Sequence, residues 1–187
     1  GYKMGTKRIG LARVEALMEN LKREISGMRE EVQYITTTAD QDLSSLTGNT
    51  TIIVNAALAS GKFIRLPEAT TANSGMHIRV VFALAPAATA LVGFVTTKIV
   101  GGASSISDAT EGQATANAGL ASSAIGTANL RVELDVDSDA KAGGHPGTVL
   151  DFYYHGVANQ VIYRGHLIGD VDTPTLASHF SSTAVNA

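Results

Sequence analysis

The chain of 187 residues contains no cysteine. This absence excludes disulfide bonds, thiolate nucleophiles and zinc sites with thiolate ligands. Stability must therefore come from packing and from assembly with other chains. The hydrophobic fraction of 44% is enough for a real core, and the length suits one domain of ordinary size with an extension.

Charged residues are also scarce, at 17% of the chain with a net charge of −3. This balance gives no electrostatic support to a nucleic-acid partner or to an anionic membrane surface. The N-terminal residues differ from the rest of the chain, because basic side chains are concentrated there. This basic group would either dock on an acidic surface or stay solvated. The group consists of Lys3, Lys7, Arg8 and Arg13.

One uncharged segment, residues 80–97, is long enough to raise the question of a membrane span. Pro86 lies near its middle, and β-branched residues flank it. These features favour two buried strands and a turn, so no membrane partner is predicted.

Motifs for catalysis are missing as well. Gly61-Lys62 lacks the upstream glycine of a phosphate-binding loop, and no Gly-x-Ser-x-Gly occurs. Glycoside hydrolysis would need paired carboxylates, but no spacing singles out a pair among Glu68, Glu111 and Glu133. We therefore predict no enzyme, no catalytic residue and no cofactor.

Metal ligands are present without a recognisable arrangement. Asp135, Asp137 and Asp139 alternate along the chain and could converge on calcium, but a solvated strand face running into a turn is the simpler interpretation. No metal site is predicted. The histidines are scattered, with no pair at a ligand spacing, at His77, His145, His155, His166 and His179.

An aromatic group near the C-terminus has two interpretations, a platform for sugar stacking or part of the core. Alternation in a strand places Phe152 and Tyr154 on one face and Tyr153 on the other. At least half of the group, which also includes Tyr163, is therefore expected in the core. Glycan binding stays open as an alternative.

The strongest positive feature is a heptad stripe over residues 8–35, in which every a and d position is apolar. A helix of this length is marginal in water unless its apolar face is covered, so the stripe predicts an oligomerising coiled coil. A helix folded back on its own β domain is the alternative. The a and d residues are Leu11, Val14, Met18, Leu21, Ile25, Met28, Val32 and Ile35.

A trimer is the preferred state of this coiled coil. Leu11 at an a position, with the β-branched Val14 and Ile35 at d positions, disfavours a parallel dimer. Gly27, at an outer position, weakens the helix and could mark a bend.

After the helix the pattern changes to short β segments, and we divide the chain into an arm and helix (1–35), a linker (36–50) and a β domain (51–187). No later segment has a helical period long enough for a parallel crossover. The expected fold is therefore mainly β, an antiparallel jelly-roll-like sandwich preceded by a long N-terminal helix. Strands are expected at 51–58, 62–66, 76–84, 90–100, 129–137, 148–155 and 160–168, with a weaker candidate at 175–180.

Residues 101–128 interrupt this pattern, because they are small, polar and rich in glycine, alanine, serine and threonine. We interpret them as a long surface loop. Such a loop would either contact a partner or be a flexible connection without a binding role.

The segment 4–13 (MGTKRIGLAR), continued by 16–24 (ALMENLKRE), resembles the opening of virion structural proteins from marine tailed phages that infect cyanobacteria. Segments 66–76 (LPEATTANSGM) and 93–103 (GFVTTKIVGGA) are similar to the body of the same group. The resemblance covers most of the chain, but its motifs carry no catalytic meaning and no functional residue transfers from it. It implies a capsid-associated role, as a decoration or cement protein or a head fibre.

The resemblance and the helix together predict a homotrimeric structural protein on the capsid surface of a virion. Its partners would be the major capsid protein or another virion subunit, with the N-terminal basic group as the contact. The alternative is a binding module that displays loops such as 101–128 or 138–147 to a host glycan.

Overall fold

The computed structural model of the chain describes residues 10–28, 30–87, 92–108, 129–169, 176 and 179–182. The chain divides into two compact units, residues 1–30 and 31–187. The first unit contains α1, Leu11–Met28, which is the single α-helix among the described residues. Within the described ranges, no helix has the length and apolar character that crossing a membrane requires.

Helix α1 ends earlier than the heptad stripe predicts. It stops at Met28, directly after Gly27, and Val32 and Ile35 lie in a strand instead. Glycine weakens the end of the helix, and the β-branched and aromatic residues that follow it favour an extended chain. Ile35 is only 1% exposed, so the prediction that it lies in an oligomer interface is wrong.

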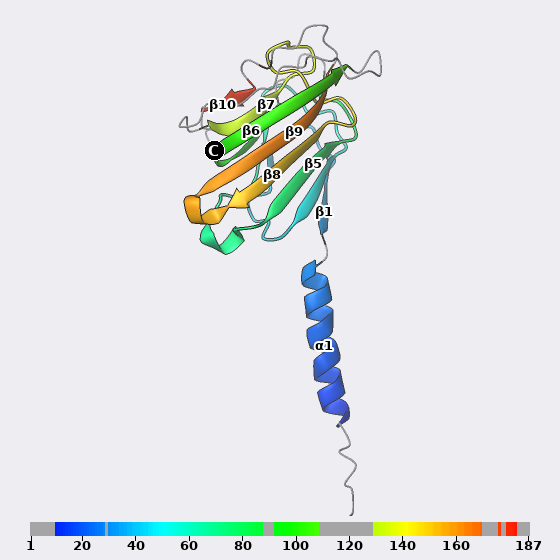
Figure 1. Cartoon of the computed structure of the whole chain (residues 1–187). Coiled ribbons are helices and arrows are strands. Elements are labelled where there is room, and N and C mark those ends of the chain that lie inside the picture. The colour runs from blue at the N-terminus through cyan, green and yellow to red at the C-terminus, as the bar shows by residue number, and fades with distance from the viewer. Residues whose placement is uncertain are drawn as a thin grey trace, which may run out of the picture. The chain divides into compact units, whose positions relative to one another are not determined.

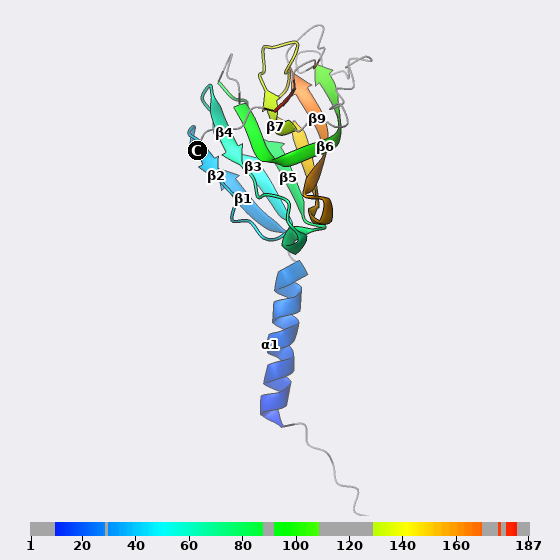
Figure 2. The same cartoon turned by 90° about the vertical axis from the view of Figure 1, so that its left-hand side faces the viewer.

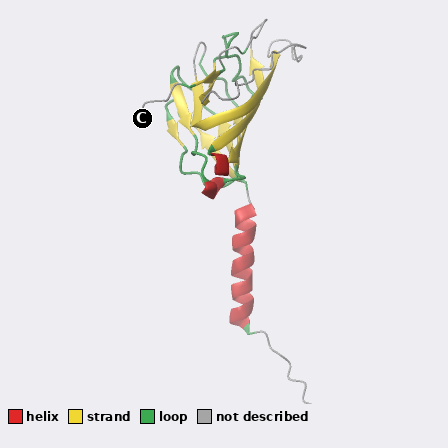
Figure 3. Ribbon diagram, turned by 60° about the vertical axis from the view of Figure 1, so that its left-hand side comes forward, coloured by secondary structure: helices red, strands yellow, loops and turns green. Residues whose placement is uncertain are grey.

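The regular structure described in the second unit consists of strands and two short 3-10 turns, η1 (Thr71–Asn73) and η2 (Gly156–Ala158), which lie side by side (Figure 3). Seven of the predicted strands are present, although β6 ends eight residues later than expected, and the weaker candidate at 175–180 shares only Phe180 with β10. The two strands expected within residues 80–97 also exist, as parts of β5 and β6. The strands are β1 (Glu31–Ile35), β2 (Gln41–Asp42), β3 (Thr50–Val54), β4 (Lys62–Arg65), β5 (His77–Phe82), β6 (Val92–Asp108), β7 (Asn129–Leu134), β8 (Val149–His155), β9 (Gln160–Gly169) and β10 (Phe180–Ser181).

The strands form one mixed, nearly closed, barrel-like sheet in the order β1-β3-β5-β8-β9-β6-β4-β2. Figure 1 faces the run from β6 to β5, and Figure 2 faces β1 to β4. Strands β1, β3 and β5 are parallel to one another, and so are β2, β4 and β6. The antiparallel hairpin β8-β9 joins these two groups, which we call the first wing and the second wing.

The prediction of an antiparallel sheet is therefore wrong. It assumed that a parallel pair needs a helical crossover, as in most parallel sheets. Here the connection between two neighbouring strands of one wing is a strand of the other wing. Strand β2 thus connects β1 to β3, and β4 connects β3 to β5. Strand β2 lies within the predicted linker, residues 36–50, and β1 lies just before it.

The core lies inside the barrel and is continuous. Alternate residues of β3, β5, β8 and β9 are buried, as a strand with one face on a core requires. An aromatic row passes through it, with neighbouring ring centroids 5.3 to 6.3 Å apart. The rings belong to Phe82, Phe94, Phe152, Tyr163 and Phe180.

The expected loop at 101–128 is partly a strand. Residues 101–108 continue β6 and pair in parallel with β9, from Gly102 opposite Tyr163 to Asp108 opposite Gly169. Backbone pairing does not depend on large apolar side chains, so the small-residue composition concealed this strand. Residues 109–128 lie outside the described residues.

The position of β1 leads to a prediction about the free energy of unfolding. Val32 and Ile35 are both stripe positions, but Val32 is 48% exposed and Ile35 is buried. Ile35→Ala should lower the free energy of unfolding by about 3 kcal/mol, since it opens a cavity in the core. Val32→Ala is the control and should cost under about 1 kcal/mol. Urea denaturation measures both, and equal effects would contradict the assignment of these residues to β1.

Candidate functional site

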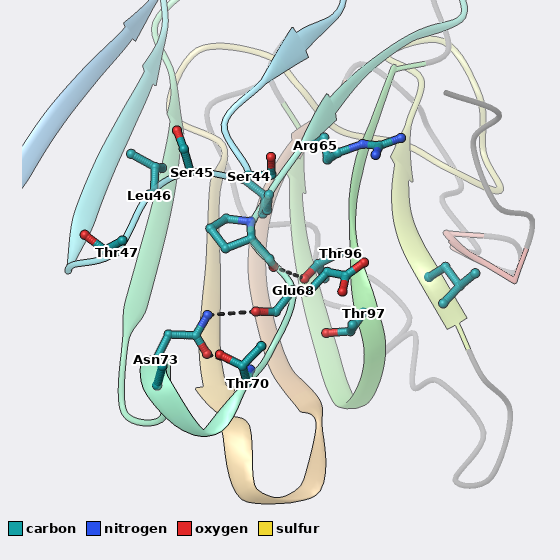
Figure 4. Close-up of a pocket in the computed structure, with 14 residues that line it drawn as sticks. Ser44, Ser45, Leu46, Thr47, Arg65, Glu68, Thr70, Asn73, Thr96 and Thr97 are labelled. Carbon is teal, nitrogen blue, oxygen red and sulfur yellow. Dashed lines mark hydrogen bonds between the residues drawn. The ribbon is translucent and has the colours of Figure 1, made fainter.

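A pocket of about 750 Å³ lies beside β4 and β6 (Figure 4). Fourteen residues line it, and most carry hydroxyl or other polar groups. They come from the loop 44–47, the end of β4 and the segment after it (65–73), Thr96 and Thr97 of β6, and Leu130 of β7.

Pro67, one of the lining residues, is held by a hydrogen-bonded network around its carbonyl oxygen. The Thr96 hydroxyl donates to this oxygen at 2.6 Å, and the Tyr154 hydroxyl donates to it at 3.0 Å. Burial raises the pKa of Tyr154, so its hydroxyl stays protonated as a donor. Two donors on one buried carbonyl fix the backbone at Pro67.

The residues after Pro67 are fixed in the same way, by side chains that reach the backbone. The Ala69 N–H donates to the Thr97 hydroxyl at 2.8 Å. The Asn73 side chain donates to the Glu68 carbonyl at 2.7 Å and accepts from the Thr70 N–H at 2.8 Å. The segment 67–70, which we call the pinned segment, therefore holds the exposed Glu68 side chain on a rigid backbone.

Two charged side chains line the pocket, Arg65 and Glu68. Hydrogen bonds from Ser44 hold the pKa of the exposed Asp42 below its ordinary value, and the charge of Arg65 acts in the same direction. Asp42 therefore contributes a negative charge near the Arg65 end of the pocket. Together these groups give the pocket donors and acceptors without a strong net charge.

The predicted interface residues of α1 have exposed side chains. Leu11 is 75% exposed, Leu21 55% and Ile25 52%, and Val14 and Met18 are exposed as well. Arg13 lies on this helix. The side chain of Met28 and the residues Lys3, Lys7 and Arg8 lie outside the described part of the chain.

The acidic residues considered for calcium do not lie on a continuing strand. Strand β7 ends at Leu134, and the next residues form a turn closed by the Asp135 N–H, which donates to the Lys141 carbonyl at 2.9 Å. Among the described residues, no group of three histidine or acidic side chains is placed to hold a metal ion. Glu111 lies outside the described residues.

The aromatic group belongs mainly to the core, as alternation predicted. Phe152, Tyr154 and Tyr163 are buried, and Tyr153 is 42% exposed. Tyr153 stacks on His77, with ring centroids 4.5 Å apart, and the His77 Nε2 lies 2.8 Å from the Asp151 carboxylate. This surface cluster was invisible in the sequence, because 74 residues separate His77 from Asp151.

A second polar cluster is buried around Glu133. Glu133 is 2% exposed and forms ion pairs with Lys141 and with Arg131, whose Nε lies 2.5 Å from the carboxylate without hydrogen-bond geometry. The ring of His179 contacts the Tyr163 hydroxyl at 3.0 Å and the Glu133 carbonyl at 2.9 Å. The cluster thereby anchors β10 to β7.

Comparison of the chain with models of known protein families, with curated proteins and with solved structures gave no match.

Gly156 controls how closely η2 approaches the pinned segment. A Cβ atom at this position would lie 1.7 Å from the Thr70 carbonyl oxygen, and the Gly156 N–H donates to the Ser74 hydroxyl. Gly156→Ala should therefore destabilise the fold by about 3 kcal/mol, measured by urea denaturation. Gly48→Ala is the control, since no atom lies within 4 Å of its Cβ position. An unchanged stability of Gly156→Ala would contradict this packing.

His179 should make the stability dependent on pH. Burial lowers its pKa from 6.5 to about 4, against the opposing effect of Glu133. The unfolded chain therefore binds the proton more tightly, and the folded state loses about 3 kcal/mol as the pH falls from about 6.5 to about 4.

Urea denaturation across this pH range measures the effect. His179→Gln should be less stable at neutral pH, but its stability should fall less on acidification than that of the unmodified protein. His155→Gln removes an exposed histidine and should keep the original pH dependence. Parallel pH profiles for the unmodified protein and His179→Gln would contradict the role of His179.

Proposed function

We propose that this chain is a structural protein of a phage virion, a capsid decoration or cement protein or a head fibre. In this proposal α1 joins copies of the chain, and the β unit reinforces or decorates the shell. The observation that carries it is the exposed apolar stripe of α1, supported by the resemblance of several segments to virion structural proteins.

The stripe favours a second copy of the chain as the partner of the helix. Its residues follow the alternating three- and four-residue spacing of a coiled coil, from Leu11 to Ile25, and a coiled coil buries such a seam against the same seam of another helix. An isolated helix of 18 residues would be marginal in water. Covering the stripe therefore stabilises both the helix and the assembly.

Three copies remain the preferred number. Leu11 at a and Val14 at d disfavour a parallel dimer, although Ile35 no longer contributes to this argument, because it lies in the β core. The helix spans only about two and a half heptads, or about 27 Å, so the seam alone would be weak. Binding to a capsid surface would add the affinity that the short seam lacks.

The N-terminal basic group is the proposed capsid contact. Lys3, Lys7, Arg8 and Arg13 precede or begin the helix, and a positive arm of this kind attaches to an acidic surface by charge. The same charges on three copies would act together.

The oligomer is tested by charges placed on the seam. Leu21→Asp with Ile25→Asp should convert the assembly into monomers in sedimentation-velocity measurements, because each copy would have to bury two carboxylates. Ala16→Asp with Asn20→Asp is the control, since it adds two carboxylates outside the a and d positions. Circular dichroism should show the β unit intact in both. An unmodified chain that stays monomeric at high concentration would overturn the proposed assembly.

The place in the particle needs a separate experiment. Mass spectrometry of purified virions from a phage that encodes this chain should detect it, and a reconstruction of the particle should contain density for it on the shell. Absence of the chain from the purified particles would overturn the proposal.

A further inference from the structure

We infer that the pocket beside β4 and β6 binds a neutral, hydroxyl-rich ligand, namely a short saccharide. Every residue that lines this pocket belongs to the β unit. The inference therefore goes beyond the proposed assembly role and does not depend on association of α1.

The charged lining groups suit the hydroxyl groups of a sugar, which both donate and accept hydrogen bonds. Glu68 offers acceptor oxygens, and Arg65 offers several donors. Neither side chain forms a hydrogen bond or an ion pair with another described residue, so both are available to a ligand. Hydrogen bonds to charged groups are stronger than those between neutral groups, so these two side chains should dominate binding.

The backbone that carries Glu68 is already ordered. The pinned segment is held by the side chains of Thr96, Thr97 and Asn73 on its two sides. Binding therefore does not have to order this part of the wall, and the cost of immobilisation is reduced.

The charge balance points to a neutral ligand. The charges of Arg65 and Glu68 cancel, and Asp42 lies close enough to Arg65 to interact with it electrostatically. An anion would meet these two carboxylates with only one cation to oppose them. Leu46 and Leu130 also line the pocket and offer apolar surface for the C–H face of a sugar ring.

The dimensions and the chemistry favour binding without hydrolysis. A volume of about 750 Å³ lies in the range of pockets that enclose small organic ligands. Glycoside hydrolysis generally uses two carboxylates on either side of the bond, and Glu68 is the single carboxylate among the lining residues.

Saturation-transfer NMR on the full chain tests the inference, with maltotriose, cellotriose and lactose as neutral probes and glucuronic acid as the acidic comparison. At least one neutral probe should bind, and glucuronic acid should bind more weakly than that probe. Glu68→Gln and Arg65→Ala should each weaken binding about tenfold. The controls are Glu31→Gln and Arg164→Ala, which remove exposed charges outside the pocket and should leave binding unchanged.

Three results would overturn the inference: no signal from any neutral probe, equal binding by Glu68→Gln and the unmodified chain, or tighter binding of glucuronic acid. The variant Leu21→Asp with Ile25→Asp should bind the sugar as the unmodified chain does. Its affinity therefore separates a failure of the pocket inference from a failure of the proposed assembly.

Discussion

The interleaving of the two wings is the constraint on which the rest of the β unit depends. From β1 to β6, consecutive strands belong alternately to the first and the second wing, so neither wing can form without the chain passing through the other. Strand β4 therefore lies parallel to β6, with Arg65 opposite Val95. The residues after Arg65 consequently run beside Thr96 and Thr97, which hold the pinned segment and complete the pocket wall.

The sequence predicted strand positions well and their arrangement poorly. Alternation of apolar and polar residues marked segments such as 148–155, because strand β8 has one face on the core. Direction is not encoded in that pattern, so the parallel wings were missed. Ile35 was assigned to the helix because the heptad stripe continues past Gly27 without a break. The pattern does not show where the helix ends, and the pairing of β1 with β3 does.

The candidate site could not be predicted in the same way. The lining at Pro67 depends on contacts with Thr96 and Tyr154, which are far away in the chain and belong to no motif. Threonine and serine are common surface residues, and their spacing carries no signal. Glu68 was noticed only as one carboxylate among several. The burial of Glu133 was not predicted, because a partner such as Lys141 cannot be inferred from the sequence pattern.

The hairpin β8-β9 has a consequence for the order in which the chain can fold. It is the element that connects the first wing to the second, and it comes after both in the sequence. Contacts between residues distant in sequence slow folding, because a long loop must close before they form. On a ribosome, which delivers the N-terminal residues first, the barrel would stay open until residue 169 has emerged, and slow, late closure would then be the step most exposed to misassembly.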